Sequence, residues 1–362
     1  MTVTLRGSLR ASVDNIQYSN TARSPSTDTR VTDDGSLLIL GMERNVGGDL
    51  RAIGQLDFRL RTDASAPAAP EGIRFSGNSH VGLRSRQWGR IFVGRNELHH
   101  FNNESELAPR GGTLRASSLG ILSFAGGGGT AIAAAGRTSN VIHYTTPNWG
   151  GLTLIVAHST APGANSQEAD TGSDTRKGRA WNLHPNFEFA NGQVGYSFWD
   201  AKFDAPTAAT AAAQLASADQ RGHRLYGSYG WRGFKVGLAW DKSTLEAAAS
   251  ADALLPVGRK IGDRTAWSIP ASYTWGAHAI HGHYTKARDD KAMAAPDGAK
   301  MWATAYIYSF TNETSGAITL TKLTNDASAF YNLFTNVSVA GGLATRPGED
   351  TRLWALTLVH RF

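Results

Sequence analysis

The feature that most limits how this chain can fold is a long hairpin that repeats along it. Short glycine-bearing turns punctuate the sequence, and four of them, at Gly150, Gly192, Gly233 and Gly276, follow one another at steps of 42, 41 and 43 residues. Between successive turns lie two stretches in which apolar and polar side chains alternate, as in a β-strand with two different faces. The sequence therefore predicts long antiparallel hairpins, with short turns at one end and long loops at the other.

Alternating segments of this kind cover most of the chain and predict sixteen strands. Their expected ranges are residues 2–17, 36–45, 50–62, 78–87, 90–96, 137–147, 151–159, 178–190, 193–203, 221–231, 234–245, 264–275, 278–288, 300–310, 316–325 and 351–362. Strands of roughly ten residues suit a tilted membrane strand, and bacterial barrels have an even number of strands. We therefore expect an all-β fold, a 16-stranded antiparallel transmembrane β-barrel.

The two faces of these strands differ in chemistry. The apolar face includes Val3, Leu5, Leu9, Val13, Leu50, Leu56, Phe58, Phe234, Val236, Leu238, Trp240, Tyr273, Trp302 and Tyr306, and the polar face includes Arg6, Arg10, Asp57, Arg59, His80, Arg84, Arg137, His143, Asp241 and His283. Alternation alone does not show which face points outward. A membrane barrel turns its apolar face to the lipid, whereas a soluble sandwich buries its apolar face in the core. Four tryptophans at short turns favour a membrane barrel with an aromatic girdle; they are Trp88, Trp149, Trp231 and Trp275.

A soluble β-propeller is the main alternative, because a repeat of about 40 to 45 residues is also its signature. A propeller has four short strands in each repeat, whereas each repeat here holds two long ones. A propeller or a lectin-like binding protein would be soluble without detergent. We expect no enzymatic activity, since no set of serine, histidine and acidic residues stands in a pattern that places its members together.

The composition restricts the possible partners. A helix needs about 20 apolar residues to cross a membrane, and the longest weakly apolar run, residues 125–136, consists mostly of glycine and alanine. The formal net charge of +6 favours anionic partners, which could be nucleic acid, lipid A or a small anion. The absence of cysteine fits an oxidising envelope compartment and many cytosolic proteins equally.

Two local motifs do not predict a cofactor. His281 and His283 share one strand face about 7 Å apart, but no cysteine or acidic residue is adjacent to complete a metal site. The glycines at 126–129 lack the following Gly-Lys-Ser/Thr of a phosphate-binding loop, and we expect them to allow close backbone packing instead. We therefore expect neither a metal nor a cofactor.

Five stretches of the chain resemble one known family in the same order. They are VTLRGSL near the start, NVGGDLRAIGQLDF around the first short turn, WGRIFVGRN before a long loop, NVIHYTTPNWGGL after that loop, and LVHRF at residues 358–362. In these motifs the chain resembles the trimeric sixteen-stranded general porins of Gram-negative outer membranes, in particular their β-proteobacterial branch.

The resemblance implies one porin domain over residues 1–362, in the cell outer membrane, with short periplasmic turns and long extracellular loops. It implies that a third loop, at about 97–136, folds inward and narrows the pore. It also implies a homotrimer joined by the outer faces of the first and last strands, contact with outer-membrane lipid and lipopolysaccharide, and an assembly machinery that reads Phe362. No nucleic acid partner is implied. The chain departs from the family in its loop sequence and in Leu37–Gly41, where relatives commonly carry a wall arginine.

The expected function is passive diffusion of small hydrophilic solutes, with a preference for anions set by charges on the pore wall. Four arginines are the best candidates for cations at the narrowest part of the pore, because they lie on the polar, inward face of their strands and away from turns. They are Arg10, Arg59, Arg84 and Arg137. The candidates for the opposing acidic side are Asp57, Glu104 and Glu106. The alternative interpretation is that these arginines pair with inward carboxylates and hold the loop in place.

Overall fold

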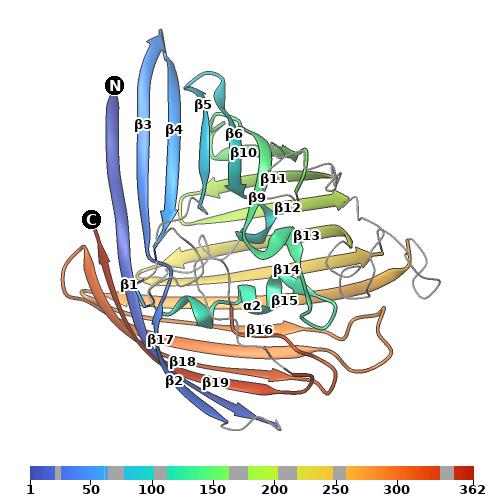
Figure 1. Ribbon diagram of the computed structural model, residues 1–362. Coiled ribbons are helices and arrows are strands. Elements are labelled where there is room, and N and C mark those ends of the chain that lie inside the picture. The colour runs from blue at the N-terminus through green and yellow to red at the C-terminus, as the bar shows by residue number, and fades with distance from the viewer. Residues whose placement is uncertain are drawn as a thin grey trace.

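The computed structural model describes residues 1–20, 26–60, 62–63, 77–101, 112–162, 178–202, 218–247, 258–334 and 346–362. Within these ranges the chain forms one large antiparallel sheet (Figure 1). Its strands are β1 (Thr2–Ser19), β2 (Thr27–Asp33), β3 (Leu37–Gly47), β4 (Leu50–Arg59), β5 (Ser79–Ser85), β6 (Gly89–Glu97), β9 (Arg137–Thr145), β10 (Leu152–Ser159), β11 (Arg179–Phe189), β12 (Gly192–Lys202), β13 (Asp219–Trp231), β14 (Phe234–Glu246), β15 (Lys260–Trp275), β16 (His278–Ala287), β17 (Ala299–Ser309), β18 (Thr314–Asn325) and β19 (Asp350–Arg361).

The sheet closes on itself. Consecutive strands pair around the wall, and β19 pairs with β1 from Ser8 opposite Arg361 to Ser19 opposite Asp350. Of the seventeen strands in the described part of the sheet, β2 and β3 pair with the two halves of β1, so together they occupy one position in the wall. The predicted sixteen-stranded antiparallel barrel is therefore confirmed. The β-propeller alternative is wrong, because the wall strands belong to a single sheet.

The break between β2 and β3 explains the one wall segment that the sequence did not predict. The Asp33 carboxylate accepts the N–H groups of Gly35 and Ser36, both at 3.1 Å, and so makes a local turn within the strand. Residues 33–35 read Asp-Asp-Gly, a sequence that favours a turn. The sequence therefore predicted that the second strand begins after them, at residue 36. Pairing with β1 continues the strand beyond this turn.

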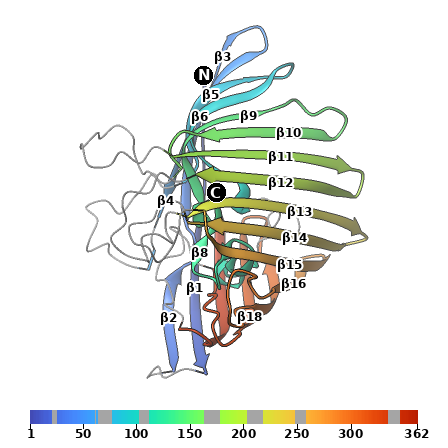
Figure 2. The ribbon, with the colours of Figure 1, turned by 90° about the vertical axis from the view of Figure 1, so that its right-hand side faces the viewer.

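Apolar side chains cover the outer face of the barrel. Leu5, Phe234 and Leu358 expose 61%, 54% and 54% of their surface, and they represent a belt that runs around the wall. Trp88, Trp149, Trp231 and Trp275 are also exposed and lie at the short turns, several of which gather at one end of the barrel in Figure 2. A soluble monomer rarely exposes apolar surface on this scale, so the belt is the lipid-facing surface.

The chain between β6 and β9 turns back into the barrel. Its described elements are η1 (His99–Phe101), η2 (Leu114–Ala116), α2 (Leu119–Leu122), β7 (Phe124–Ala125), β8 (Thr130–Ala131) and η3 (Ile132–Ala135). The short helix α2 contacts β15, β16 and β17 from the inside (Figure 1). Across the described residues, no helix is both long and apolar enough to span a membrane.

One side of the barrel interior is dry. Ile121 and Leu122 of the inner loop are fully buried, and they share an apolar cluster with the inward side chains Met301, Leu323 and Leu353 on β17 to β19. This part of the wall therefore presents apolar residues on both faces, one set to lipid and one to the loop.

The glycine run 126–129 allows the tip of the β7–β8 hairpin to approach residues 330–331. Gly128 has φ +99°, and a Cβ there would lie 2.6 Å from the backbone nitrogen of Tyr331. The N–H of Phe330 donates to the carbonyl of Gly127 at 2.8 Å. Glycine is needed because of both the positive φ and this close approach, which agrees with the packing role expected from the sequence.

Candidate functional site

Two buried arginines fasten the inner loop to the wall. Arg224 on β13 and Arg264 on β15 both pair with Asp241 on β14, at 2.9 Å each. Arg224 Nη2 and Arg264 Nη2 also donate to the carbonyl of Leu122, at 2.8 and 2.9 Å. Leu122 is the last residue of α2, where carbonyl groups have no partner within the helix and the helix dipole favours a cation. The two guanidinium groups therefore act as an anchor for the loop.

A second anchor holds residues 112–115 of the loop against β1. Arg115 pairs with Asp14 at 2.9 Å, and both side chains are fully buried. Arg10 pairs with Asp34 at 3.0 Å and donates to the carbonyl of Gly112 at 2.9 Å. Asp34 in turn accepts the N–H of Leu114 at 2.8 Å. Each buried charge thus has an ionic partner, as burial requires.

The inner wall carries a cluster of arginines and carboxylates where β4 and β6 end and β9 begins. We call it the arginine–carboxylate cluster. Arg59 pairs with Asp57 at 2.7 Å on β4, and Arg137 on β9 pairs with Glu97 on β6 at 2.7 Å. Arg95 lies on β6 and donates to the hydroxyl of Ser139 at 3.3 Å. The cluster holds three arginines against two carboxylates, so it is net cationic.

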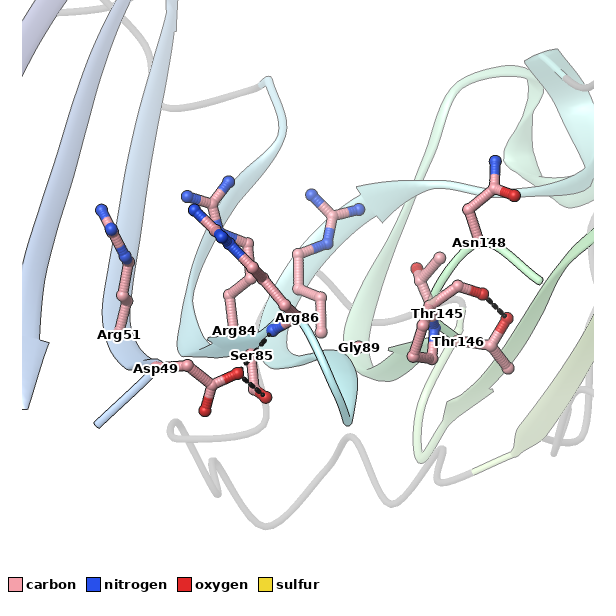
Figure 3. A pocket seen from close by; sticks show the side chains of 11 residues that line it. Asp49, Arg51, Arg84, Ser85, Arg86, Gly89, Thr145, Thr146 and Asn148 are labelled. Atoms are coloured by element: carbon pink, nitrogen blue, oxygen red, sulfur yellow. Dashed lines mark hydrogen bonds between the residues drawn. The ribbon is translucent and has the colours of Figure 1, made fainter. Parts of the chain in front are cut away.

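A second cationic group lies at the short-turn end of the barrel. Arg84 on β5 and Arg51 on β4 both pair with Glu43, at 2.7 and 2.5 Å. Arg86 and Arg90 line the same pocket, together with Asp49 (Figure 3). The Ser85 hydroxyl donates to Asp49 at 2.7 Å, and this hydrogen bond is the main reason why the pKa of Asp49 is lowered.

Comparison with known proteins decides the family. The family model for Gram-negative porins matches residues 2–350. The chain belongs to the Gram-negative porin family. It is 24% identical over 204 residues to an outer membrane porin protein of Bordetella pertussis. This match spans 55% of this chain and 50% of the relative's length.

Solved porins share the fold. The anion-selective porin from Comamonas acidovorans is 18% identical and superposes with a TM-score of 0.76, covering 100% of this chain and 99% of that one. OmpT of Vibrio cholerae, solved in a trimer form, is 12% identical with a TM-score of 0.67 and covers 100% and 99%. The Bordetella relative and the Comamonas porin agree with the expected β-proteobacterial resemblance. The chain is a multi-pass β-barrel of the Gram-negative outer membrane.

The porin barrel separates the residues that the sequence grouped as constriction cations. Arg59 and Arg137 lie in the arginine–carboxylate cluster with Asp57. Arg10 lies at the loop anchor and is 8% exposed, whereas Arg84 lies at the short-turn end. Glu104 and Glu106 fall outside the described residues.

Sequence reasoning missed several charged residues of the porin interior. Arg224, Arg264, Arg115 and Arg95 were not selected, although Arg224 lies directly opposite Asp241 in the strand register. A search for opposite charges with inward parity on successive strands could have found this pair. Arg115 offered no such signal, because it lies in an irregular loop.

Phe362 closes the porin barrel at the short-turn end. Its N–H and carbonyl form two hydrogen bonds with the backbone of Gly7, at 3.2 and 2.9 Å. A Cβ at Gly7 would lie 2.6 Å from the phenyl ring, so the glycine leaves the space that the ring occupies. The ring is 51% exposed and continues the outer apolar face of β19.

Proposed function

We propose that this porin is a passive, water-filled channel for small hydrophilic solutes and that it prefers anions. The observation that carries the proposal is the charge of the wall formed by β3 to β6, β9 and their short turns. Its described inward groups comprise seven arginines against four carboxylates, namely Arg51, Arg59, Arg84, Arg86, Arg90, Arg95 and Arg137 against Glu43, Asp49, Asp57 and Glu97.

The preference arises from many charges acting together. Two unit charges about 4 Å apart in water interact by only about 1 kcal/mol, so one arginine has a weak effect. Several arginines line the wall within about one Debye length of a permeating ion. Their electrostatic attractions on that ion therefore add up at physiological salt. The channel needs no covalent step, and we propose no enzymatic activity.

We propose that the constriction lies where the inner loop faces the arginine–carboxylate cluster of β4, β6 and β9. Arg59 and Arg137 supply its cationic side together with Arg95, and Arg10 contributes by holding the loop. Glu104 and Glu106 in the loop are proposed for the opposing acidic side, with Asp57 on the wall. Arg84 acts further along the path, at the short-turn end.

We further propose that three copies assemble through the outer faces of the first and last strands. An outer groove of about 460 Å³ crosses β1, β2 and β17 to β19, and Val13, Val31, Ile318 and Leu356 line it. Its apolar lining suits a neighbouring subunit or lipid. Outer-membrane lipid, lipopolysaccharide and an assembly machinery that reads Phe362 are the other proposed partners.

The test is the reversal potential of the refolded protein in a planar bilayer under a KCl gradient. We expect discrete conductance steps and a chloride-selective potential. Arg59→Gln should shift the potential toward cation selectivity and Asp57→Asn toward anions, whereas Lys286→Gln, a control exposed on the outer face of β16, should leave it unchanged. Cation selectivity of the unmodified channel would refute the anion preference, and absence of conductance would refute the channel.

A further inference from the structure

Three neighbouring strands each place an arginine at the same level near the short turns. Arg84 on β5 lies directly opposite Arg51 on β4 and directly opposite Arg90 on β6. Residues opposite each other in an antiparallel sheet have Cα atoms about 4.5–5.5 Å apart, and like charges in this position destabilise the sheet. The row therefore does not serve the stability of the barrel, and its charge needs another partner.

The protein offsets this charge only in part. Glu43 divides its two carboxylate oxygens between Arg51 and Arg84. Arg90 lies over the ring of Phe92, 5.1 Å from its centroid. Arg86 adds a fourth guanidinium group. In the described ranges the guanidinium groups of Arg86 and Arg90 have no carboxylate partner, and the backbone N–H of Arg86 donates to Asp49 at 2.9 Å. Among the described residues, Asp49 is the one other acid that lines this site, so four guanidinium groups face two carboxylates.

These side chains enclose a pocket of about 700 Å³. Figure 3 shows Arg51, Arg84 and Arg86 extending to the same side above Asp49 and Ser85. Residues of β9 and of the turn after it complete the lining; they are Thr145, Thr146, Pro147 and Asn148. A volume of this size lies within the usual range for small-molecule sites. We call this pocket, with its four arginines, the arginine vestibule.

We infer that the arginine vestibule binds a small, multiply charged anion of the phosphate or pyrophosphate class at the short-turn mouth of the channel. Guanidinium groups present planar pairs of N–H donors that match the oxygen atoms of a phosphoryl group. Several such groups around one pocket can satisfy a tetrahedral oxyanion on more than one side, which a single chloride ion does not require. The inference rests on the proposed channel, in which the vestibule is a second anion site in series with the loop.

The test measures how inorganic pyrophosphate blocks the chloride current when it is added to one side of the bilayer. The sequence has no cysteine, so Ala277→Cys in the turn between β15 and β16, labelled with a membrane-impermeant thiol reagent, reports which side carries the short turns. We expect block from the short-turn side at a concentration about tenfold lower than from the loop side, since the arginine vestibule lies at the short-turn mouth.

The decisive variant is Arg86→Gln combined with Arg90→Gln. Neither guanidinium group has a carboxylate partner in the described part of the chain, and the substitutions keep the backbone N–H that Arg86 donates to Asp49, so no acid is left unpaired. We expect the blocking concentration from the short-turn side to rise about tenfold or more. Arg232→Gln is the matched control, because Arg232 lies in another short turn, over the ring of Trp231, and outside the pocket; it should change nothing.

Calorimetric titration of the detergent-folded protein with pyrophosphate separates this inference from the proposed channel. Binding that is lost in the double variant, together with sided block, supports the vestibule. Equal block from both sides, unchanged by the double variant and without calorimetric binding, overturns it while leaving the channel intact. Binding without any conductance supports the vestibule and refutes the proposed function.

Discussion

Arginines occur in two contrasting settings on the inner wall of this porin. Arg224 and Arg264 are fully buried; they share Asp241 and donate to loop carbonyls. Arg51 and Arg84 have side chains that are 44% and 50% exposed and share one carboxylate. Residue type and strand parity are the same in both settings. The difference shows that an inward arginine anchors the loop where acceptors surround it, and remains available to solutes where acceptors are scarce.

The largest expected effect comes from removing the carboxylate that the buried Arg224 and Arg264 share. Asp241→Asn leaves two buried guanidinium groups without their carboxylate, which typically costs about 3–5 kcal/mol. We expect the heat-modifiable gel transition to fall to lower temperature and the single-channel conductance to rise as the loop loosens. Asp200→Asn is the control, because Asp200 pairs with the exposed Arg221 and such surface pairs contribute about 0–1 kcal/mol. Equal behaviour of the two variants would contradict the anchoring role of Asp241.

A smaller effect is expected when the exposed arginines Arg51 and Arg84 lose the carboxylate that they share. Glu43→Gln removes the acid shared by Arg51 and Arg84, so the short-turn mouth becomes more positive. The reversal potential of this variant should move further toward anion selectivity, while its thermal stability should change little because the ion pairs are exposed. Glu313→Gln, in the turn between β17 and β18, is the control for a general loss of negative charge. A shift toward cations, or an equal shift in the control, would show that the vestibule does not act on permeating ions.

The smallest expected effect concerns a third setting, two carboxylates that form no salt bridge with any described residue. Asp290 and Asp297 lie between β16 and β17, and the N–H of Asp290 donates to Asp297 at 2.6 Å. Burial raises the pKa of both carboxyl groups above the usual 3.8. Because the folded pKa is raised, the stabilising contribution is complete below pH 3.8 and is lost as the pH rises through the folded pKa. Acid should therefore tighten this loop.

Hydrogen exchange of residues 288–298 measures this effect. Protection should increase as the pH is lowered, after correction for the intrinsic pH dependence of exchange. Asp297→Asn removes one of the two titrating groups, so its protection should depend less on pH. Protection that falls in acid in the unmodified protein would reverse the assigned sign.

Much of the fold could be predicted because its signal is local. Two-residue alternation and glycine turns indicated all sixteen wall positions, including the last strand up to Phe362. The missed segment β2 shows the limit of this signal, since Asp33 and Gly35 have turn chemistry but lie within a strand that β1 continues to pair.

The candidate site was less predictable. Parity places Arg10, Arg59, Arg84 and Arg137 on the inner face, but it says nothing of their height along the barrel or of what the loop covers. Arg84 lies at the mouth because the turn at residues 86–88 follows two residues later. Arg10 lies at the anchor because Asp34 and the carbonyl of Gly112, distant in sequence, meet there.

The sequence by itself determined the strand pattern, the lipid-facing belt and the cationic character of the interior, because each depends on neighbours one or two residues apart. The tertiary structure alone decided which arginines are neutralised and which face the pore. That distinction depends on contacts across the barrel, such as Arg224 to Leu122 and Arg84 to Glu43. Neutralising a charge requires an acceptor within hydrogen-bonding distance, and closure of the sheet with the loop inside it determines where those acceptors lie.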